Sequence, residues 1–103
     1  MRSVELSKTF ENQLIELLDF GEQRFGQTTA AASRRRVEIT IRDLLADHPA
    51  IKTPDKRLGL VRYHVTRTPF VLVYDFDDLA LRVHFILHIH ADLNDLDPHS
   101  AQW

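Results

Sequence analysis

The sequence contains no cysteine, and this absence excludes disulfide bridges, thiolate metal sites and a cysteine nucleophile. Glycine and proline are also scarce, with three and four residues among 103, which excludes a fibrous or low-complexity chain. No stretch approaches the roughly 18 apolar residues that a membrane span needs, and residues 1–7 lack an apolar targeting segment. With 44% hydrophobic residues, we expect one small cytoplasmic domain with a single core and no membrane partner.

Charge is distributed unevenly, although the formal net charge is only −2. Residues 75–97 carry a local charge of −5, because six aspartates outnumber Arg82. Residues 52–67 carry a local charge of +4 and form a basic strip. The cations of this strip are Lys52, Lys56, Arg57, Arg62 and Arg67. A near-neutral total favours a protein target over RNA, and the strip is the expected partner surface.

Hydrophobic periodicity predicts a short strand and two helices in the first half of the chain. Residues 4–6 form the strand, and Ser7 is the expected N-cap of a helix that reaches about Phe25. Gly26 ends this helix, because glycine adopts positive φ at little cost. The second helix runs from residue 28 or 29 to about residue 48. The two helices therefore form an antiparallel hairpin.

The second half of the chain favours strands. Three are predicted, over residues 60–66, 70–76 and 79–90, and together they form a meander. Odd-numbered and even-numbered residues of segment 70–74 are both apolar, which predicts a central strand that is covered on both faces. In the last strand, alternation places one set of apolar side chains together on one face. That set is Leu79, Leu81, Val83, Phe85, Leu87 and Ile89, opposite Ala80, Arg82, His84, Ile86, His88 and His90.

These elements predict an α+β fold of order β-α-α-β-β-β. We expect the helical hairpin to pack on one face of an antiparallel sheet of about four strands. The other face is left open except for the tail.

Two groups of polar residues in the meander have chemical potential. His88 and His90 lie two apart on a strand and project to one side, a spacing that can chelate a metal, with His84 and Asp92 nearby. A half-exposed polar sheet face explains the same pattern better, so neither a metal site nor a cofactor is predicted. The second group begins with Arg62 and His64, which share one face of the predicted strand over residues 60–66.

If Arg62 and His64 lie near Arg82 and His84, the cluster can hold a phosphodiester, with histidine as acid or base. The alternative is a solvated face or a seat for an acidic peptide.

Six short segments stand out together with this order of elements. They are VELS at residues 4–7, RFG at 24–26, LLADHP at 44–49, VRYH at 61–64, PFVLVY at 69–74 and LHIHAD at 87–92. In their order and spacing, these segments resemble the RelE/ParE superfamily of bacterial type II toxins. The resemblance implies one toxin domain over residues 1–98, followed by a tail over residues 99–103. RelE-like nucleases carry arginines where this chain has Val71 and Ala91, which favours a ParE-like plasmid stabilisation protein.

For a ParE-like toxin, the resemblance implies inhibition of DNA gyrase by binding, without catalysis. A cognate antitoxin would neutralise it in a hetero-oligomer, by wrapping the helices and sheet. The expected partner-binding residues are Lys56, Arg57, Arg62, Arg67 and His90.

Three alternatives remain open. One is a RelE-like endoribonuclease that cleaves messenger RNA on the ribosome. Its catalytic residues would be Arg62, His64, Arg82 and His88. The others are a family member that has lost toxicity and a histidine-based metal-binding protein.

Overall fold

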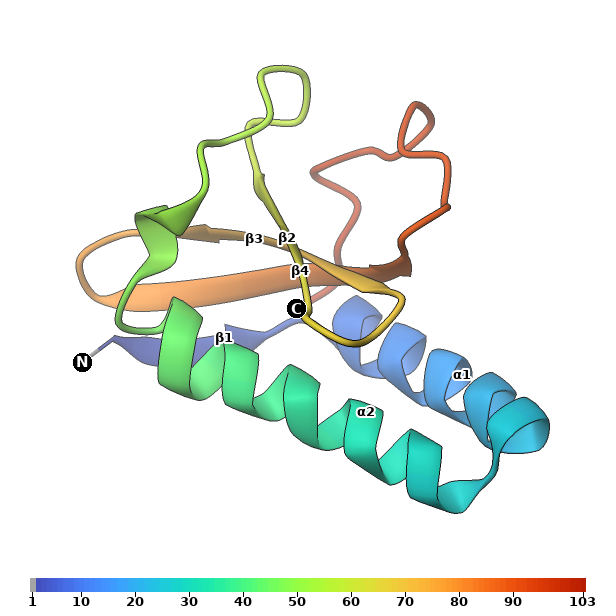
Figure 1. Ribbon diagram of the computed structural model, residues 1–103. Coiled ribbons are helices and arrows are strands. Elements are labelled where there is room, and N and C mark those ends of the chain that lie inside the picture. The colour runs from blue at the N-terminus through green and yellow to red at the C-terminus, as the bar shows by residue number, and fades with distance from the viewer. Residues whose placement is uncertain (1) are drawn as a thin grey trace.

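A computed structural model describes residues 2–103 of the chain, and its helices and strands follow the predicted order (Figure 1). The elements are β1 (Ser3–Leu6), α1 (Lys8–Phe25), α2 (Gln27–Ile39), a π-helical turn (Thr40–Leu45), a 3-10 turn (Pro49–Ile51), β2 (Val61–His64), β3 (Phe70–Phe76) and β4 (Ala80–His88). The two helices lie against one face of the sheet, so the α+β arrangement is confirmed. Among residues 2–103, no helix is long and apolar enough to cross a membrane.

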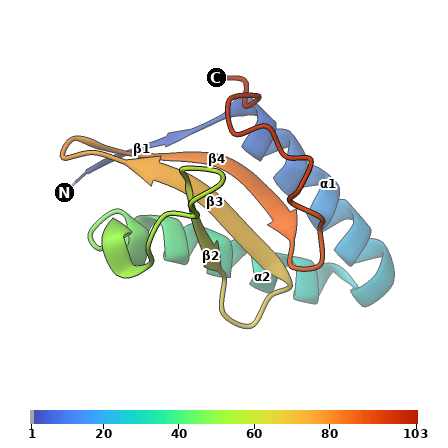
Figure 2. The same ribbon diagram turned by 90° about the horizontal axis from the view of Figure 1, so that it is seen from above.

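The sheet contains four strands in the order β1-β4-β3-β2. β3 is antiparallel to both β2 and β4, as expected for a meander. β1 pairs with β4 in parallel, so the sheet is mixed and the expectation of a purely antiparallel sheet needs this correction. The two reversals of the meander make β4 run in the same direction as β2, and β1 joins the sheet at its edge beside β4 in that direction as well (Figure 2).

A β-bulge at His84 changes which side chains of β4 share a face. Val73 pairs with Phe85 and Tyr74 pairs with Val83, which leaves His84 without a partner in the register. Because His84 is an extra residue in β4, the side chains that follow it point to the opposite faces from those that strict alternation would give them. The predicted single face is therefore wrong: Val83 belongs to the core under the helices, whereas Phe85 belongs to a cluster on the other face of the sheet.

The ends of α1 are as predicted. The Ser7 hydroxyl accepts a hydrogen bond from the Phe10 N–H at 2.8 Å and donates one to the His84 carbonyl at 2.6 Å. Gly26 has φ 89° at the turn between the helices. The second helix is shorter than predicted, because α2 gives way to the π-helical turn, closed by a hydrogen bond from the Ala46 N–H to the Ile41 carbonyl at 3.0 Å.

The main core lies between the helical hairpin and the sheet. Its largest buried side chains include Phe10, Leu45, Leu72, Tyr74 and Leu81. Burial contributes roughly 2 kcal/mol for each such apolar side chain. The Tyr74 hydroxyl donates to the Pro49 carbonyl at 2.6 Å, and burial raises the pKa of this phenol to about 12. Tyr74 thus remains protonated and ties the sheet to the 3-10 turn.

The far face of the sheet, opposite the helices, carries a smaller core. Leu58, Leu60, Val73 and Phe85 are buried there, and Leu96 and Ala101 of the tail pack on them. Leu96 and Ala101 therefore cover part of the far face, and Figure 2 shows the tail running beside β4.

The last residues of the tail lie against the start of α1. The Gln102 carbonyl accepts from the Lys8 N–H at 2.6 Å and from the Thr9 N–H at 3.4 Å, which gives the helix N-terminus two of its hydrogen bonds. The ring of Trp103 meets that of His84 edge-on, with 4.9 Å between centroids. The C-terminal residues thus lie where β1 ends and α1 begins, whereas Arg2 and Ser3, at the other end of β1, lie beside the β3–β4 turn.

Candidate functional site

A hollow of about 660 Å³ lies on the far face, between β2, the end of β4 and the loops that cover them. Four of the predicted site residues line this far-face hollow, namely Arg57, Arg62, His64 and His88. Arg62 and His64 come from β2, where alternate residues point to one face, so the predicted pairing of these two side chains is confirmed.

The two arginines of the far-face hollow, Arg57 and Arg62, are bound by the chain itself. The Arg62 guanidinium lies 3.3 Å from the Asp55 carboxylate. The pKa of Asp55 is lowered, first by a hydrogen bond from the Leu58 N–H and further by the Arg57 N–H and the Arg62 charge, so this carboxylate is ionised at neutral pH. Arg57 donates to the Asn94 side-chain oxygen and, at 3.2 Å, to the Leu93 carbonyl, which joins the loop before β2 to the tail.

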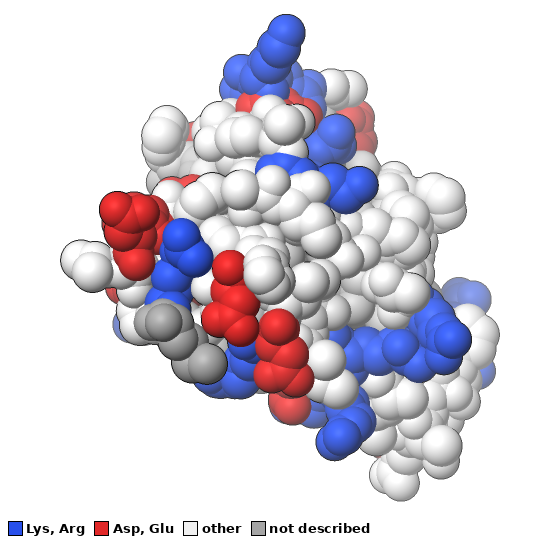
Figure 3. Space-filling model, turned by 60° about the vertical axis from the view of Figure 1, so that its left-hand side comes forward, with Lys and Arg blue, Asp and Glu red and all other residues white. Residues whose placement is uncertain are grey.

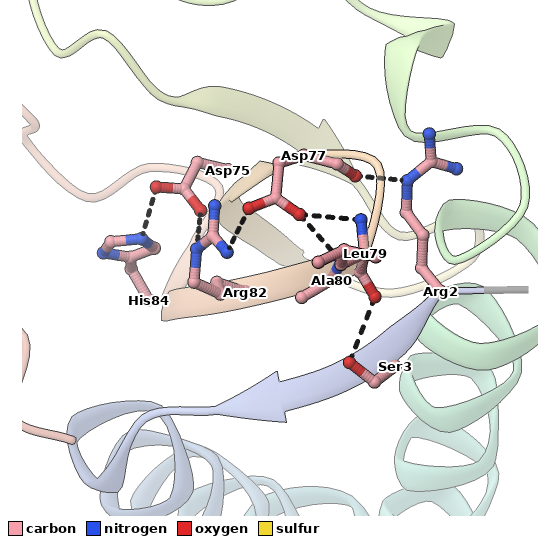
Figure 4. Close-up of polar contacts among 8 residues, drawn as sticks. All are labelled: Arg2, Ser3, Asp75, Asp77, Leu79, Ala80, Arg82 and His84. Atoms are coloured by element: carbon pink, nitrogen blue, oxygen red, sulfur yellow. Dashed lines mark hydrogen bonds and ion pairs between the residues drawn. The ribbon is translucent and has the colours of Figure 1, made fainter.

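Arg82 does not line the far-face hollow. It lies on β4 beside the turn between β3 and β4, where two carboxylates hold it (Figure 4). Its Nε is 2.7 Å from Asp75 and its Nη1 is 2.9 Å from Asp77. These bonds raise the pKa of Arg82, with Asp77 as the largest cause. Arg82 therefore does not line the far-face hollow with Arg62 and His64, and its guanidinium is engaged by two carboxylates.

Asp77 organises this β3–β4 turn. Its carboxylate accepts from the Leu79 N–H at 2.8 Å and the Ala80 N–H at 2.9 Å. The hydrogen bond from Leu79, followed by that from Arg82, lowers the pKa of Asp77 to about 2. Figure 3 shows acidic and basic side chains next to one another on one part of the face in view, and further basic side chains gathered on another part.

His84 is the most enclosed of the predicted polar residues. Its side chain is 12% exposed, and its Nε2 lies 3.3 Å from Asp75. Neither ring nitrogen makes a hydrogen bond within the described chain, and the ring of Trp103 meets the His84 ring edge-on. His84 therefore packs between the tail and β4 and does not face the far-face hollow.

His88 and His90 lie side by side at the end of β4, with ring centroids 5.3 Å apart. The Nδ1 atom of His88 accepts a hydrogen bond from the His90 N–H at 3.1 Å. Within residues 2–103, no three His, Asp or Glu side chains come together in a way that could hold a metal ion. The pair is thus a local hydrogen-bonded contact.

A second depression of about 350 Å³ lies between the helical hairpin and the β2–β3 turn, and we call it the hairpin groove. Arg67 lines it, together with the aromatic residues Phe20 and Phe25. These two rings are 56% and 68% exposed. Helical periodicity places Phe25 on one apolar stripe of the first helix, and the stripe comprises Phe10, Leu14, Leu17, Leu18, Gly21 and Phe25. In the structure Phe25 is the last residue of α1, and its ring is exposed. Phe20 was missed because it falls outside that stripe.

Comparison with known proteins decides the family. A family model described as "ParE toxin of type II toxin-antitoxin system, parDE" matches residues 4–98. The chain belongs to the ParE toxin family. It is also 28% identical over 94 residues to "Toxin ParE1" of Caulobacter vibrioides, a match that covers 91% of this chain and 94% of that protein. The RelE-like alternative is not favoured over this assignment.

A solved structure supports the fold of this ParE-family chain. The structure is titled "Chromosomal ParDE TA system from P. aeruginosa", and it matches with a TM-score of 0.73 at 13% sequence identity. The match covers 85% of this chain and 96% of that one. At this identity the likeness establishes the two-layer α+β fold, and the sequence matches carry the family assignment.

The predicted partner-binding residues of this ParE-family chain are spread over two surfaces. Arg57 and Arg62 line the far-face hollow, and Arg67 lines the hairpin groove. Lys56 and His90 are exposed in the segments beside the hollow, but their side chains do not line it. The chain thus offers a polar surface on the far face and an apolar one at the hairpin.

Proposed function

We propose that this ParE-family chain is a cytoplasmic toxin that inhibits DNA gyrase by binding and that a cognate antitoxin holds inactive in a toxin–antitoxin hetero-oligomer. In this proposal the chain is not an enzyme. Its own sequence family, the parDE type II toxin–antitoxin system, supports the presence of an antitoxin.

The state of the arginines carries the proposal of binding without catalysis. A ribonuclease must direct cations at a phosphodiester and supply an acid or base beside them. Here Arg82 is held by Asp75 and Asp77, and Arg62 is paired with Asp55. Cations that are neutralised inside the chain have little charge left to stabilise a phosphorane-like transition state.

A supercoiling assay with purified gyrase tests the target. We expect the purified chain to block supercoiling of relaxed plasmid DNA when it is in molar excess over gyrase. The control is the same chain preincubated with the antitoxin encoded beside it, which should restore supercoiling. Full gyrase activity in an excess of toxin that arrests growth on expression would contradict gyrase as the target. Absence of growth arrest would instead identify a family member that has lost toxicity.

The ribonuclease alternative has one supporting observation, because Arg62, His64 and His88 do share the far-face hollow. Primer extension on a message translated by ribosomes distinguishes it. We expect no new 5′ ends when the chain is added. New ends that disappear with Arg62→Ala would establish cleavage and contradict the binding mechanism.

A further inference from the structure

Arg67 has an unusual backbone conformation in the turn between β2 and β3. Its φ is 63°, and among the described residues other than glycine it is the only one with positive φ. The turn is closed by a hydrogen bond from the Thr68 N–H to the Val65 carbonyl at 3.1 Å, so Arg67 occupies its third position. Glycine or asparagine is usual at such a position, because a Cβ atom makes left-handed backbone unfavourable.

The surrounding hydrogen bonds hold this unfavourable conformation in place. The buried Thr68 hydroxyl donates to the Val65 carbonyl at 2.9 Å and accepts from the Phe70 N–H at 3.1 Å. The Nε2 atom of His64 lies 2.6 Å from the Thr68 carbonyl. Strain that is maintained by its surroundings in this way is commonly found where a side chain must be presented to a ligand.

The arginine that this strain positions lines the hairpin groove. Phe20 and Phe25 are the exposed aromatic residues of the groove, and Pro69 and Phe70 line it beside the turn. No acidic side chain lines the groove, and Arg67 takes part in no ion pair within residues 2–103. An apolar surface with an unneutralised guanidinium at its edge is complementary to an apolar segment that carries a carboxylate.

We propose that the hairpin groove binds an apolar segment of the antitoxin and that Arg67, at the cost of backbone strain, pairs with a carboxylate of that segment. This inference rests on the proposed toxin–antitoxin function and assigns it a surface and a specificity-determining residue. The apolar contacts supply burial, and the single charged contact selects the partner and its register.

Two substitutions separate the strain from the charge. Arg67→Gly removes both, so it should raise the Tm of the free chain by about 4 °C, because the left-handed conformation is then unstrained. Arg67→Gln keeps the Cβ atom and the strain but removes the charge, so its Tm should stay unchanged. Both variants should bind the purified antitoxin encoded beside this chain about tenfold more weakly than the wild type, as measured by titration calorimetry.

Two controls make the result specific. Thr66→Gly introduces glycine in the same turn at a residue without positive φ, and it should lower the Tm while leaving antitoxin affinity unchanged. Raising the salt concentration should weaken wild-type binding more than binding of Arg67→Gln, because the variant lacks the charge pair.

The outcomes distinguish this inference from the proposed function. Wild-type affinity in both Arg67 variants would overturn the role of Arg67 while leaving the toxin–antitoxin pair intact. If the Arg67 variants keep wild-type antitoxin affinity but lose toxicity, the groove binds the target of the toxin, and this result would also overturn the inference. A wild-type chain that does not bind the neighbouring antitoxin would contradict the proposed function itself.

Discussion

The arginines at the two hairpin turns of the meander have opposite surroundings: one is paired with carboxylates and the other is not. At the β3–β4 turn, Asp75 and Asp77 neutralise Arg82, and the turn's backbone donors are bonded by Asp77. At the β2–β3 turn, Arg67 lies in a left-handed conformation outside every ion pair of the described chain. The first arginine therefore stabilises the fold, whereas the second destabilises its own turn and is available to a partner. An exposed charged residue therefore indicates a binding surface only if it is not already paired with an opposite charge within the chain.

The largest effect is expected from breaking the β2–β3 turn. Thr68→Val removes a buried hydroxyl and leaves the Phe70 N–H without its acceptor. The free energy of unfolding should fall by about 2 kcal/mol, measured by urea denaturation. Thr66→Val, at the exposed neighbour in the same turn, is the matched control and should change stability little. Equal stability of Thr68→Val and wild type would show that this hydroxyl does not hold the turn.

A smaller effect is expected from Arg82→Gln at the β3–β4 turn. This substitution removes two charged hydrogen bonds from a partly exposed group, so the free energy of unfolding should fall by about 0.5 to 1 kcal/mol. Antitoxin affinity should not change, in contrast to Arg67→Gln. If Arg82→Gln weakens binding and Arg67→Gln does not, the roles that we assign to the two arginines are reversed.

The smallest effect concerns the acid sensitivity of the β3–β4 turn. The folded pKa of Asp77 is about 2, below its ordinary value of 3.8. The carboxylate therefore contributes stability above about pH 4, and this contribution is lost as the pH falls from about 4 to 2. Asp77→Asn should flatten this part of a stability profile measured by urea denaturation between pH 5 and 2. The neighbouring Asp78→Asn is the control, and a profile that flattens equally there would contradict the assignment.

Sequence patterns predict most of this fold because the helices and strands have strong local signals. Ser7 and Gly26 mark the ends of α1, and the change to period-two alternation marks the meander. The bulge at His84 has no such signal. Apolar side chains of β4 are buried on both faces, by the helices on one side and by Leu96 and Ala101 on the other. Odd-numbered and even-numbered positions can therefore both be apolar, and the sequence pattern does not show where the alternation shifts. The parallel pairing of β1 is equally hidden, because it depends on contacts with a distant strand.

The candidate sites were predictable only in part. Residue type identified Arg62, His64 and Arg67, since exposed cations of a basic strip are readily seen in a sequence. The ion pairs of Arg82 were missed because Asp75 and Asp77 become its neighbours only through strand pairing. The left-handed conformation of Arg67 could not be predicted, because its turn contains no glycine or asparagine, the residues that usually indicate positive φ.

The cap that Gln102 provides for α1 has a consequence for synthesis of the chain. A hydrogen bond joins residues 93 positions apart, from the Gln102 N–H to the Thr9 hydroxyl, and β1 completes its pairing only on the last strand. Such long-range contacts form late in folding. Until β4 and the residues around 102 have been synthesised, α1 lacks this cap and β1 lacks its partner strand. We therefore expect the start of α1 to gain protection from hydrogen exchange late in folding, together with the β1–β4 pairing.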